Sequence, residues 1–293
     1  MKNLLLLHIV VLIFGFTGIL GKLITIPSEA LVWYRMLFAS ASIGVYLVLK
    51  KKALLMPKKG AWQTILTGFI IAAHWVFFFE SIKQANVSVA LAALATASLF
   101  TALLEPIFFK RKLYGYELFL GGLVILGLYF IFQFETENSF GIILAIIAAF
   151  LASLFTVING RLIKKYDSTR ISFYELGGGV LAITLYFLVV KPQKFPNFEM
   201  TGMDLFYLLI LAIVCTAFAF VASVKVMEEL TPFTVSLSIN LEPVYGIVLA
   251  YLIFGEDEKM SLGFYIGTLI ILSSLFLNVW IKRKRRRKLK MNS

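Results

Sequence analysis

The chain is short of the residues that disulfides, metal sites and soluble cores require. In 293 residues it has one cysteine, Cys215, and two histidines, His8 and His74. A single cysteine excludes an intramolecular disulfide and every multi-cysteine metal site. Charged residues make up 15% of the chain, against roughly 25% in a typical soluble domain. We expect no metal and no cofactor, and the low charge argues against a water-soluble protein.

What the chain has instead is apolar sequence in long runs. It is 60% hydrophobic, with a mean hydropathy of +0.90, so lipid must solvate much of its surface. A membrane-spanning helix needs about 20 apolar residues. Ten runs of about that length occur, at residues 4–22, 31–49, 61–82, 87–109, 116–134, 139–160, 171–190, 204–224, 233–254 and 262–281. We predict an all-α integral membrane protein with ten transmembrane helices. The first run has no small-x-small cleavage site after it, so we interpret it as a retained helix and not as a signal peptide.

Acidic residues are also scarce, and the positions of the basic ones indicate topology. There are 28 lysines and arginines against 16 acidic residues, and eight of the basic residues lie in the tail 282–290. Most of the others lie in every second loop, and therefore on one side of the predicted bundle, which fits the rule that positive loops stay in the cytoplasm. Because the basic residues lie in these loops and in the tail, their excess indicates membrane topology, and we expect no nucleic-acid partner. The pattern predicts a multi-pass protein of the plasma (inner) membrane with both termini in the cytoplasm.

One segment recurs along the chain with its loop charge inverted. Residues 95–131 align without a gap with residues 241–277, sharing pairs such as Ile107/Ile253 and Gly121/Gly267. The first copy turns through a basic tripeptide at 110–112 and the second through an acidic one at 256–258. Two copies of one unit facing opposite sides of a bilayer are typical of inverted-repeat transporters. We therefore predict two inverted five-helix repeats, residues 1–136 and 137–293, the second ending in the basic cytoplasmic tail.

At this point the chain resembles the EamA-type members of the drug/metabolite transporter superfamily. Pro27 followed by Arg35 resembles the family's arginine-bearing second helix, and Leu241-Glu242-Pro243 resembles its Leu-Glu-Pro signature. In the first half, Thr96-Ala97 stands where Glu242-Pro243 stands in the second, which leaves open whether the fourth helix bends. The resemblance implies a ten-helix carrier with a central cavity, alternating access, and transport of small metabolites.

Glu242 is the most informative residue inside a predicted span, because buried ionisable groups in membranes are costly. It lies near mid-span between Asn240 and Pro243. The proline removes a backbone N–H and frees carbonyls a turn earlier. Glu242 and Asn240 are therefore candidates for the substrate or ion pathway, where a carboxylate could bind a cation, take up a proton or hold a substrate amine. The alternative is a glutamate that only fixes the Pro243 kink.

Two other charged residues occupy matching depths in opposite halves. Arg35 lies near the start of the second predicted helix and Glu175 near the start of the seventh. We interpret them, with Pro243, as gate or brace positions. For Arg35 the favoured interpretation is a structural ion pair with Glu29 or Glu80, with contact to an anionic substrate or to headgroups as alternatives.

The remaining candidates for the pathway are His74, Trp75, Asn159 and Tyr245. His74 suits a proton relay because histidine titrates near neutrality, although a hydrogen-bonded packing role is favoured. Trp75 lies far from either interface, so anchoring at the membrane surface does not explain it. Asn159 and Tyr245 are candidates for polar lining.

The predicted function is a secondary active transporter that exports small organic metabolites, such as amino acids, by alternating access. A proton is the candidate coupling ion, and the bilayer and the small-molecule substrate are the expected partners. The alternative is an intramembrane enzyme or a lipid-modifying membrane protein. Against an enzyme, the sequence has no Gly-x-Ser nucleophile motif, no His-Glu-x-x-His metal site and no phosphate-binding loop.

Overall fold

The computed structural model describes residues 2–194 and 199–291, which form helices and connecting segments without a strand. The α-helices are α1 Lys2–Leu23, α2 Ser28–Leu49, α3 Lys58–Gln84, α4 Val87–Leu94, α5 Ala97–Phe109, α6 Gly115–Phe134, α7 Ser139–Leu162, α8 Ser168–Val190, α9 Gly202–Ala212, α10 Ala219–Lys225, α11 Pro232–Ile239, α12 Glu242–Phe254 and α13 Leu262–Met291. Within the described ranges, nine segments are long and apolar enough to span a membrane, and Leu262–Asn278 is a shorter apolar helix. These segments coincide with the ten predicted runs, and the prediction of an all-helical membrane protein is confirmed.

Three of the spans are interrupted within the membrane. α4 and α5 together form one span, and α11 and α12 form another. α9 and α10 are joined by η3 (Ile213–Phe218), a turn of π-helix. Such interruptions are tolerated in lipid only where neighbouring helices satisfy the freed backbone groups, so they mark places that protein surrounds.

Polarity is arranged as expected for a protein solvated by lipid. Large apolar side chains are exposed on the outer surface, among them Leu49, Val189 and Leu252, each exposed by more than half. Polar and charged side chains, including Arg35 and Glu175, are instead buried between helices. The hydrocarbon phase solvates the apolar side chains. The polar groups lie inside the bundle because exposing them to lipid is costly.

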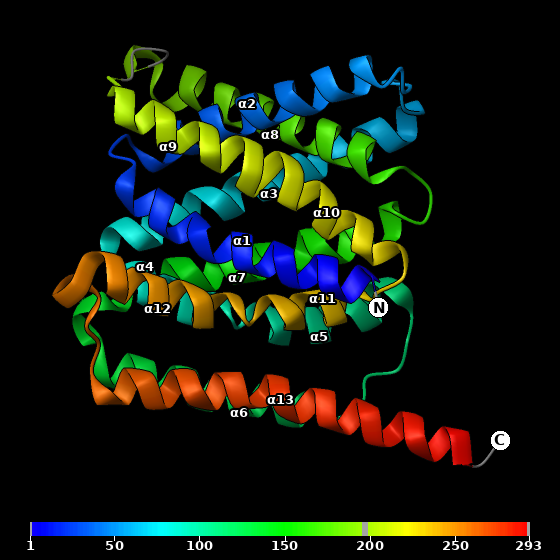
Figure 1. Ribbon diagram of the computed structural model, residues 1–293, viewed down its shortest axis with the longest axis vertical. Helices are drawn as coiled ribbons and strands as arrows, with labels where there is room; N and C mark the ends of the chain where they lie inside the picture. The colour runs from blue at the N-terminus through cyan, green and yellow to red at the C-terminus, as the bar shows by residue number, and fades with distance from the viewer. Residues whose placement is uncertain (1, 195–198, 292–293) are drawn as a thin grey trace.

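Both termini lie at the same end of the bundle, which we call the terminal face; the opposite end is the far face (Figure 1). α6 and α13 run side by side at one edge of the molecule in this view. Gly127 and Gly267 allow them to approach, because a Cβ built on Gly127 would lie 2.6 Å from the Gly267 carbonyl oxygen. Small residues serve this purpose in membrane helix pairs.

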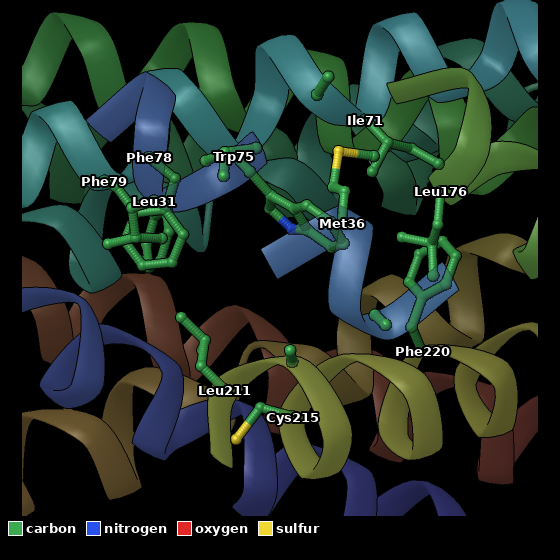
Figure 2. Packing of buried hydrophobic residues seen from close by; sticks show 14 of the residues in the cluster. Leu31, Met36, Ile71, Trp75, Phe78, Phe79, Leu176, Leu211, Cys215 and Phe220 are labelled. Atoms are coloured by element: carbon green, nitrogen blue, oxygen red, sulfur yellow. The ribbon is translucent and has the colours of Figure 1, made fainter. Parts of the chain in front are cut away.

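The main apolar core lies where α2, α3, α8 and the α9–α10 span meet (Figure 2). Figure 2 shows Trp75 and Phe79 of α3 with Leu31 and Met36 of α2, and Leu211, Cys215 and Phe220 of the α9–α10 span. Cys215 is a free, buried thiol in this cluster. This core fixes the position of Trp75 and of the neighbouring Arg35.

Ion pairs and caps connect helix ends at the far face. The carboxylate of Glu258 accepts from Lys22 Nζ at 3.0 Å and from the amides of Val87 and Ser88 at the start of α4. Lys191 Nζ donates to Glu29 Oε1 at 2.5 Å, and this hydrogen bond raises the pKa of the lysine. The first set of contacts joins α1 and α4 to the segment after α12, and the second joins α2 to the end of α8.

The terminal face has a comparable cluster around Arg111. Its guanidinium donates to Glu105 at 3.1 Å and to Glu117 at 3.0 Å. The second Glu105 oxygen accepts from the Phe233 amide at the start of α11, at 2.7 Å. A carboxylate from one half therefore caps a broken helix of the other half at each face.

Candidate functional site

A cavity of about 100 Å³ lies in the middle of the bundle. Its lining comes from both halves of the chain and includes the residues beside both helix interruptions, Leu94–Ala97 and Ile239–Pro243 in part. The volume is well below the roughly 300–1,000 Å³ of pockets that hold drug-sized ligands. The cavity in this conformation therefore suits a small guest or a few waters.

The two helix interruptions meet at this cavity. Asn240, at the end of α11, donates from Nδ2 to Ser98 Oγ at the start of α5, at 2.8 Å. One turn away, Thr101 Oγ1 of α5 donates to Ser236 Oγ of α11 at 3.1 Å. Side chains of the two crossing spans thus hold each other together where the backbone of each is interrupted.

The two interruptions have different local causes. In the second half, Pro243 occupies the first turn of α12, where a missing N–H costs no helical bond. In the first half no proline is present, yet the Thr96 amide bonds to the Ala93 carbonyl three residues back. The question that the sequence left open is answered: the fourth span is interrupted at 95–96 without a proline.

Arg35 and Glu242 bring the charges of the site together. Both line the cavity, both are at most 5% exposed, and their charges interact electrostatically. Glu242 is the first residue of α12, so its carboxylate lies where the helix dipole favours negative charge. The site therefore places a guanidinium and a carboxyl group where a small guest could contact both.

The Arg35 guanidinium is held by an aromatic ring and a hydroxyl. Its carbon lies 3.9 Å from the centroid of the Trp75 ring, a cation–π distance. Its Nε donates to Thr216 Oγ1 at 2.6 Å, and that hydroxyl, which lies in η3, donates to the Leu211 carbonyl five residues earlier, at the end of α9. A π-helical turn therefore presents the hydroxyl that positions the arginine, as π-turns often do at functional sites.

The expected ion pair of Arg35 with Glu29 or Glu80 is wrong for the described residues. Glu29 pairs with Lys191, and Glu80 accepts from Ser28 Oγ and Gln84. The reason is position: both glutamates lie at the far-face ends of their helices, whereas Arg35 extends inward to the cavity. The Arg35 Nη1 is buried and has no hydrogen-bond partner among the described residues, so this nitrogen is free to bind a guest.

His74 and Trp75 both line the cavity, on neighbouring positions of α3. His74 Nδ1 lies 2.8 Å from the Ala148 carbonyl oxygen, and its ring lies edge-on to Phe155, with centroids 5.3 Å apart. The histidine is thus hydrogen-bonded within a packed aromatic group. Trp75 supplies the face on which Arg35 rests.

Asn159 also lines the cavity, close to the terminal-face end of α7. Its Nδ2 donates to Glu175 Oε2 of α8 at 3.3 Å, and both residues are 0% exposed. Glu175 therefore lies behind Asn159 and not in the cavity wall. The two residues nevertheless form one polar pair that begins at the cavity.

Tyr245 is the one candidate for the substrate or ion pathway that the structure does not bring to the cavity. Within the described residues it is absent from the lining, is 37% exposed, and lies beside Gly15 of α1. Its side chain packs against α1, where a Cβ added at Gly15 would lie 3.2 Å from the Tyr245 Cβ.

The sequence reasoning also missed several lining residues. These are Thr17, Phe78, Phe155, Phe220, Ser223 and Ser236. Polar residues such as Thr17 in the middle of an apolar run were a usable signal for some of them. The phenylalanines gave none, since this chain has 28 of them.

No group of three histidine, cysteine, aspartate or glutamate side chains in residues 2–194 and 199–291 could hold a metal ion. The polar groups at the cavity are instead hydrogen-bond donors and acceptors around one cation and one carboxylate. This arrangement can bind and orient a small charged molecule by hydrogen bonds, cation–π contact and apolar packing.

Comparison with known proteins places the chain among transporters. An uncharacterized transporter of Archaeoglobus fulgidus is 25% identical over 256 residues, which cover 84% of this chain and 86% of that protein. Two uncharacterized transporters of Bacillus subtilis, YxxF and YdfC, are 26% and 27% identical over 86% and 83% of this chain and over 82% and 79% of their own lengths. One solved crystal structure superposes with a TM-score of 0.72 over 96% of this chain and 99% of the other, at 15% identity, which shows a shared fold.

The family comparison covers nearly the whole chain. The profile of the EamA-like transporter family matches residues 1–133 and 139–280, and so includes every span that contributes to the cavity. The resemblance seen in Arg35 and in Leu241-Glu242-Pro243 is thereby confirmed, and this multi-pass membrane protein belongs to the EamA-like transporter family.

Proposed function

We propose that this protein is a secondary active transporter that exports small zwitterionic metabolites such as amino acids by alternating access. The observation that carries the proposal is the joint presence of Arg35 and Glu242 at a cavity formed where two broken spans cross. Carriers hold substrates near mid-membrane between interrupted helices. The family membership supports transport as the activity.

The charges favour a guest with both a carboxylate and an amine. A purely anionic guest would be repelled by Glu242, and a purely cationic one by Arg35. A zwitterion places its carboxylate against the unpartnered Arg35 Nη1 and its ammonium against Glu242, so neither buried charge loses a counter-charge. Phe78, Phe155 and Phe220 provide apolar contact for a side chain.

The position of the cavity supports loading from the terminal face. Asn159 and Met227 line it within a turn of the ends of α7 and of η4 (Val226–Glu228), both at that face. The far face is joined by the contacts of Glu258 and Lys191. The basic loops indicate that the terminal face lies in the cytoplasm, so a cavity loaded from that face would receive substrate from inside, as export requires.

The test is counterflow in liposomes containing the purified full chain. Vesicles are loaded with a mixture of unlabelled L-amino acids and diluted into trace labelled ones, without ATP or a pH gradient. We expect transient uptake of label above that of empty vesicles. Arg35→Gln should reduce it at least about tenfold, because losing one charged hydrogen bond to a buried carboxylate costs about 1.5–3 kcal/mol. Uptake by the wild type no greater than by empty vesicles would overturn the proposal.

A further inference from the structure

Glu175 is a buried carboxyl about two turns into α8 from the terminal face, and the proposed substrate site does not use it. It is 0% exposed, and a Cβ added at Gly68 of α3 would collide with its backbone oxygen, so α3 and α8 are in direct contact there. The Asn159 amide supplies its one hydrogen bond, to Oε2, and Oε1 has no partner among the described residues. A carboxylate in such surroundings would lack the counter-charge that buried charges need.

The charged groups on the helices packed against α8 are engaged elsewhere. On α2, Arg35 is held by Thr216 and the Trp75 ring, and Glu29 by Lys191. On α3, His74 contacts the Ala148 carbonyl, Glu80 accepts from Ser28, and Lys83 Nζ donates to the Ile26 carbonyl.

The remaining charged groups lie at helix ends. Lys58 and Lys59 of α3, Arg161 of α7 and Lys225 of α10 are exposed at the terminal face. Within the described residues none of these groups forms an ion pair with Glu175. A proton is therefore the cation that this carboxyl can hold in the observed conformation.

Asn159 connects this carboxyl to the cavity. It lines the cavity, and its Oδ1 is buried without a partner in the described chain, as is Glu175 Oε1. The Asn159–Glu175 contact is long for a hydrogen bond, at 3.3 Å. A small displacement of α7 relative to α8 would let cavity water reach the carboxyl.

The position of Glu175 in its helix matches that of Arg35. Each lies seven residues after the first residue of its helix, Ser168 of α8 and Ser28 of α2. The helices start at opposite faces, so the two side chains enter the bundle at equal depths from opposite sides. Arg35 lines the cavity now and Glu175 does not, as expected if conformational alternation exchanges their environments.

We propose that Glu175 is the proton-binding site that couples transport, reached from the cavity past Asn159. Water on one side of the membrane delivers a proton, which forms an O–H bond at a carboxylate oxygen while Glu175 is accessible. The helices then close around the neutral carboxyl, which gives the buried position of Glu175 described above. In the opposite-facing state the O–H bond breaks and the proton leaves to water on the other side. This proposal rests on the proposed carrier function and adds the coupling ion and its site.

The experiment separates exchange from coupled accumulation in the same liposomes, with a mixture of labelled L-amino acids as probe. A gradient of one pH unit that drives one proton per substrate supports about tenfold accumulation. We expect wild type to show both counterflow and accumulation. Glu175→Gln, which remains neutral, should keep counterflow within about twofold and lose accumulation altogether. The control Glu137→Gln, an exposed glutamate, should change neither.

Accumulation by Glu175→Gln equal to wild type would overturn the proposal, as would loss of counterflow in a variant that folds normally. Absence of counterflow in wild type would instead refute the proposed substrate class. In that case, or if the variant does not fold, a second measurement on the wild-type protein decides. Dicyclohexylcarbodiimide reacts with protonated carboxyls in apolar surroundings, and mass spectrometry locates the acylurea adduct.

We expect an adduct at Glu175 whose yield falls as the pH of the reaction is raised, because the reagent requires the protonated carboxyl. Asn159→Ala should increase the labelling rate by opening the route from the cavity. No adduct at Glu175 at the acidic end, or labelling that does not change with pH, would contradict a proton site there.

Discussion

At the scale of single residues, the site depends on a few polar groups whose surroundings determine what each can do. Arg35 and Glu242 are both buried at the cavity, yet Arg35 is fixed by Trp75 and Thr216 while Glu242 begins a helix. Glu175, equally buried, has the Asn159 amide as its only hydrogen-bond partner among the described residues. We therefore assign substrate contact to the first two and proton binding to the third.

Glu242→Gln tests this division of roles. Glutamine keeps the size of the side chain but removes the charge that would hold a substrate ammonium. We expect KM for amino acids to rise by roughly tenfold or more, since a hydrogen bond to a charged group contributes about 1.5–3 kcal/mol. The dependence on a pH gradient should persist, because Glu175 is intact. Proteoliposome kinetics at several pH values measure both quantities.

Pro243→Ala is the companion variant, because it restores a backbone N–H and leaves the carboxylate in place. If Glu242 only braced the kink, Glu242→Gln would transport normally and Pro243→Ala would do the greater harm. An unchanged KM in Glu242→Gln would remove the carboxylate from the substrate site.

At the scale of helices, close backbone contact and charged caps hold the spans together. Gly68→Ala should destabilise the protein, because the added methyl would collide with the Glu175 carbonyl and force α3 away from α8. We expect a loss of about 1–3 kcal/mol, as for other overpacked interiors. Gly122→Ala is the matched control: nothing lies within 4 Å of its added Cβ, so it should be neutral or stabilise by up to about 1 kcal/mol. Thermal unfolding in detergent compares the two, and equal shifts would contradict the contact.

The far-face caps give a second prediction at this scale. Glu258→Gln removes the ion pair with Lys22 and weakens the acceptor for two α4 amides, all at a side chain that is 0% exposed. We expect stability to fall by about 1–3 kcal/mol. Glu256→Gln, two residues earlier, removes only the exposed pair with Lys259 and should cost at most about 1 kcal/mol. Similar melting temperatures for the two variants would count against a structural cap at Glu258.

The same scale shows how far the sequence could predict the structure. Apolar run lengths located all ten spans, because lipid imposes the length of each. The break before Glu242 followed from Pro243, because a proline removes a backbone N–H. The break at 95–96, the π-turn at Thr216 and the Arg35–Trp75 contact depend on packing between distant helices, so no local pattern indicated them. The sequence also did not indicate that Tyr245 lies outside the cavity, because the rotation of α12 about its own axis determines where this side chain points.

At the scale of the whole molecule, the two inverted repeats remain a prediction with new support. Each half has a broken span, the breaks meet at Ser98 and Asn240, and each half supplies a carboxylate that caps the other's broken span. Glu105 does so at the terminal face and Glu258 at the far face. This reciprocity is what a pseudo-two-fold axis in the membrane plane would produce, and it suits a carrier whose halves exchange conformations.

The orientation of the whole molecule in the membrane is the last prediction. The terminal face carries the basic loops and the far face carries Glu256 and Asp257, so the positive-inside rule places the terminal face in the cytoplasm. In a Cys215→Ser background, Lys112→Cys should resist an impermeant thiol reagent in intact cells and react after permeabilisation. Asp257→Cys, in the far-face loop, should react in both conditions, since both positions are exposed in the structure. Labelling of position 112 from outside intact cells would reverse the orientation, and with it the side from which the cavity is loaded.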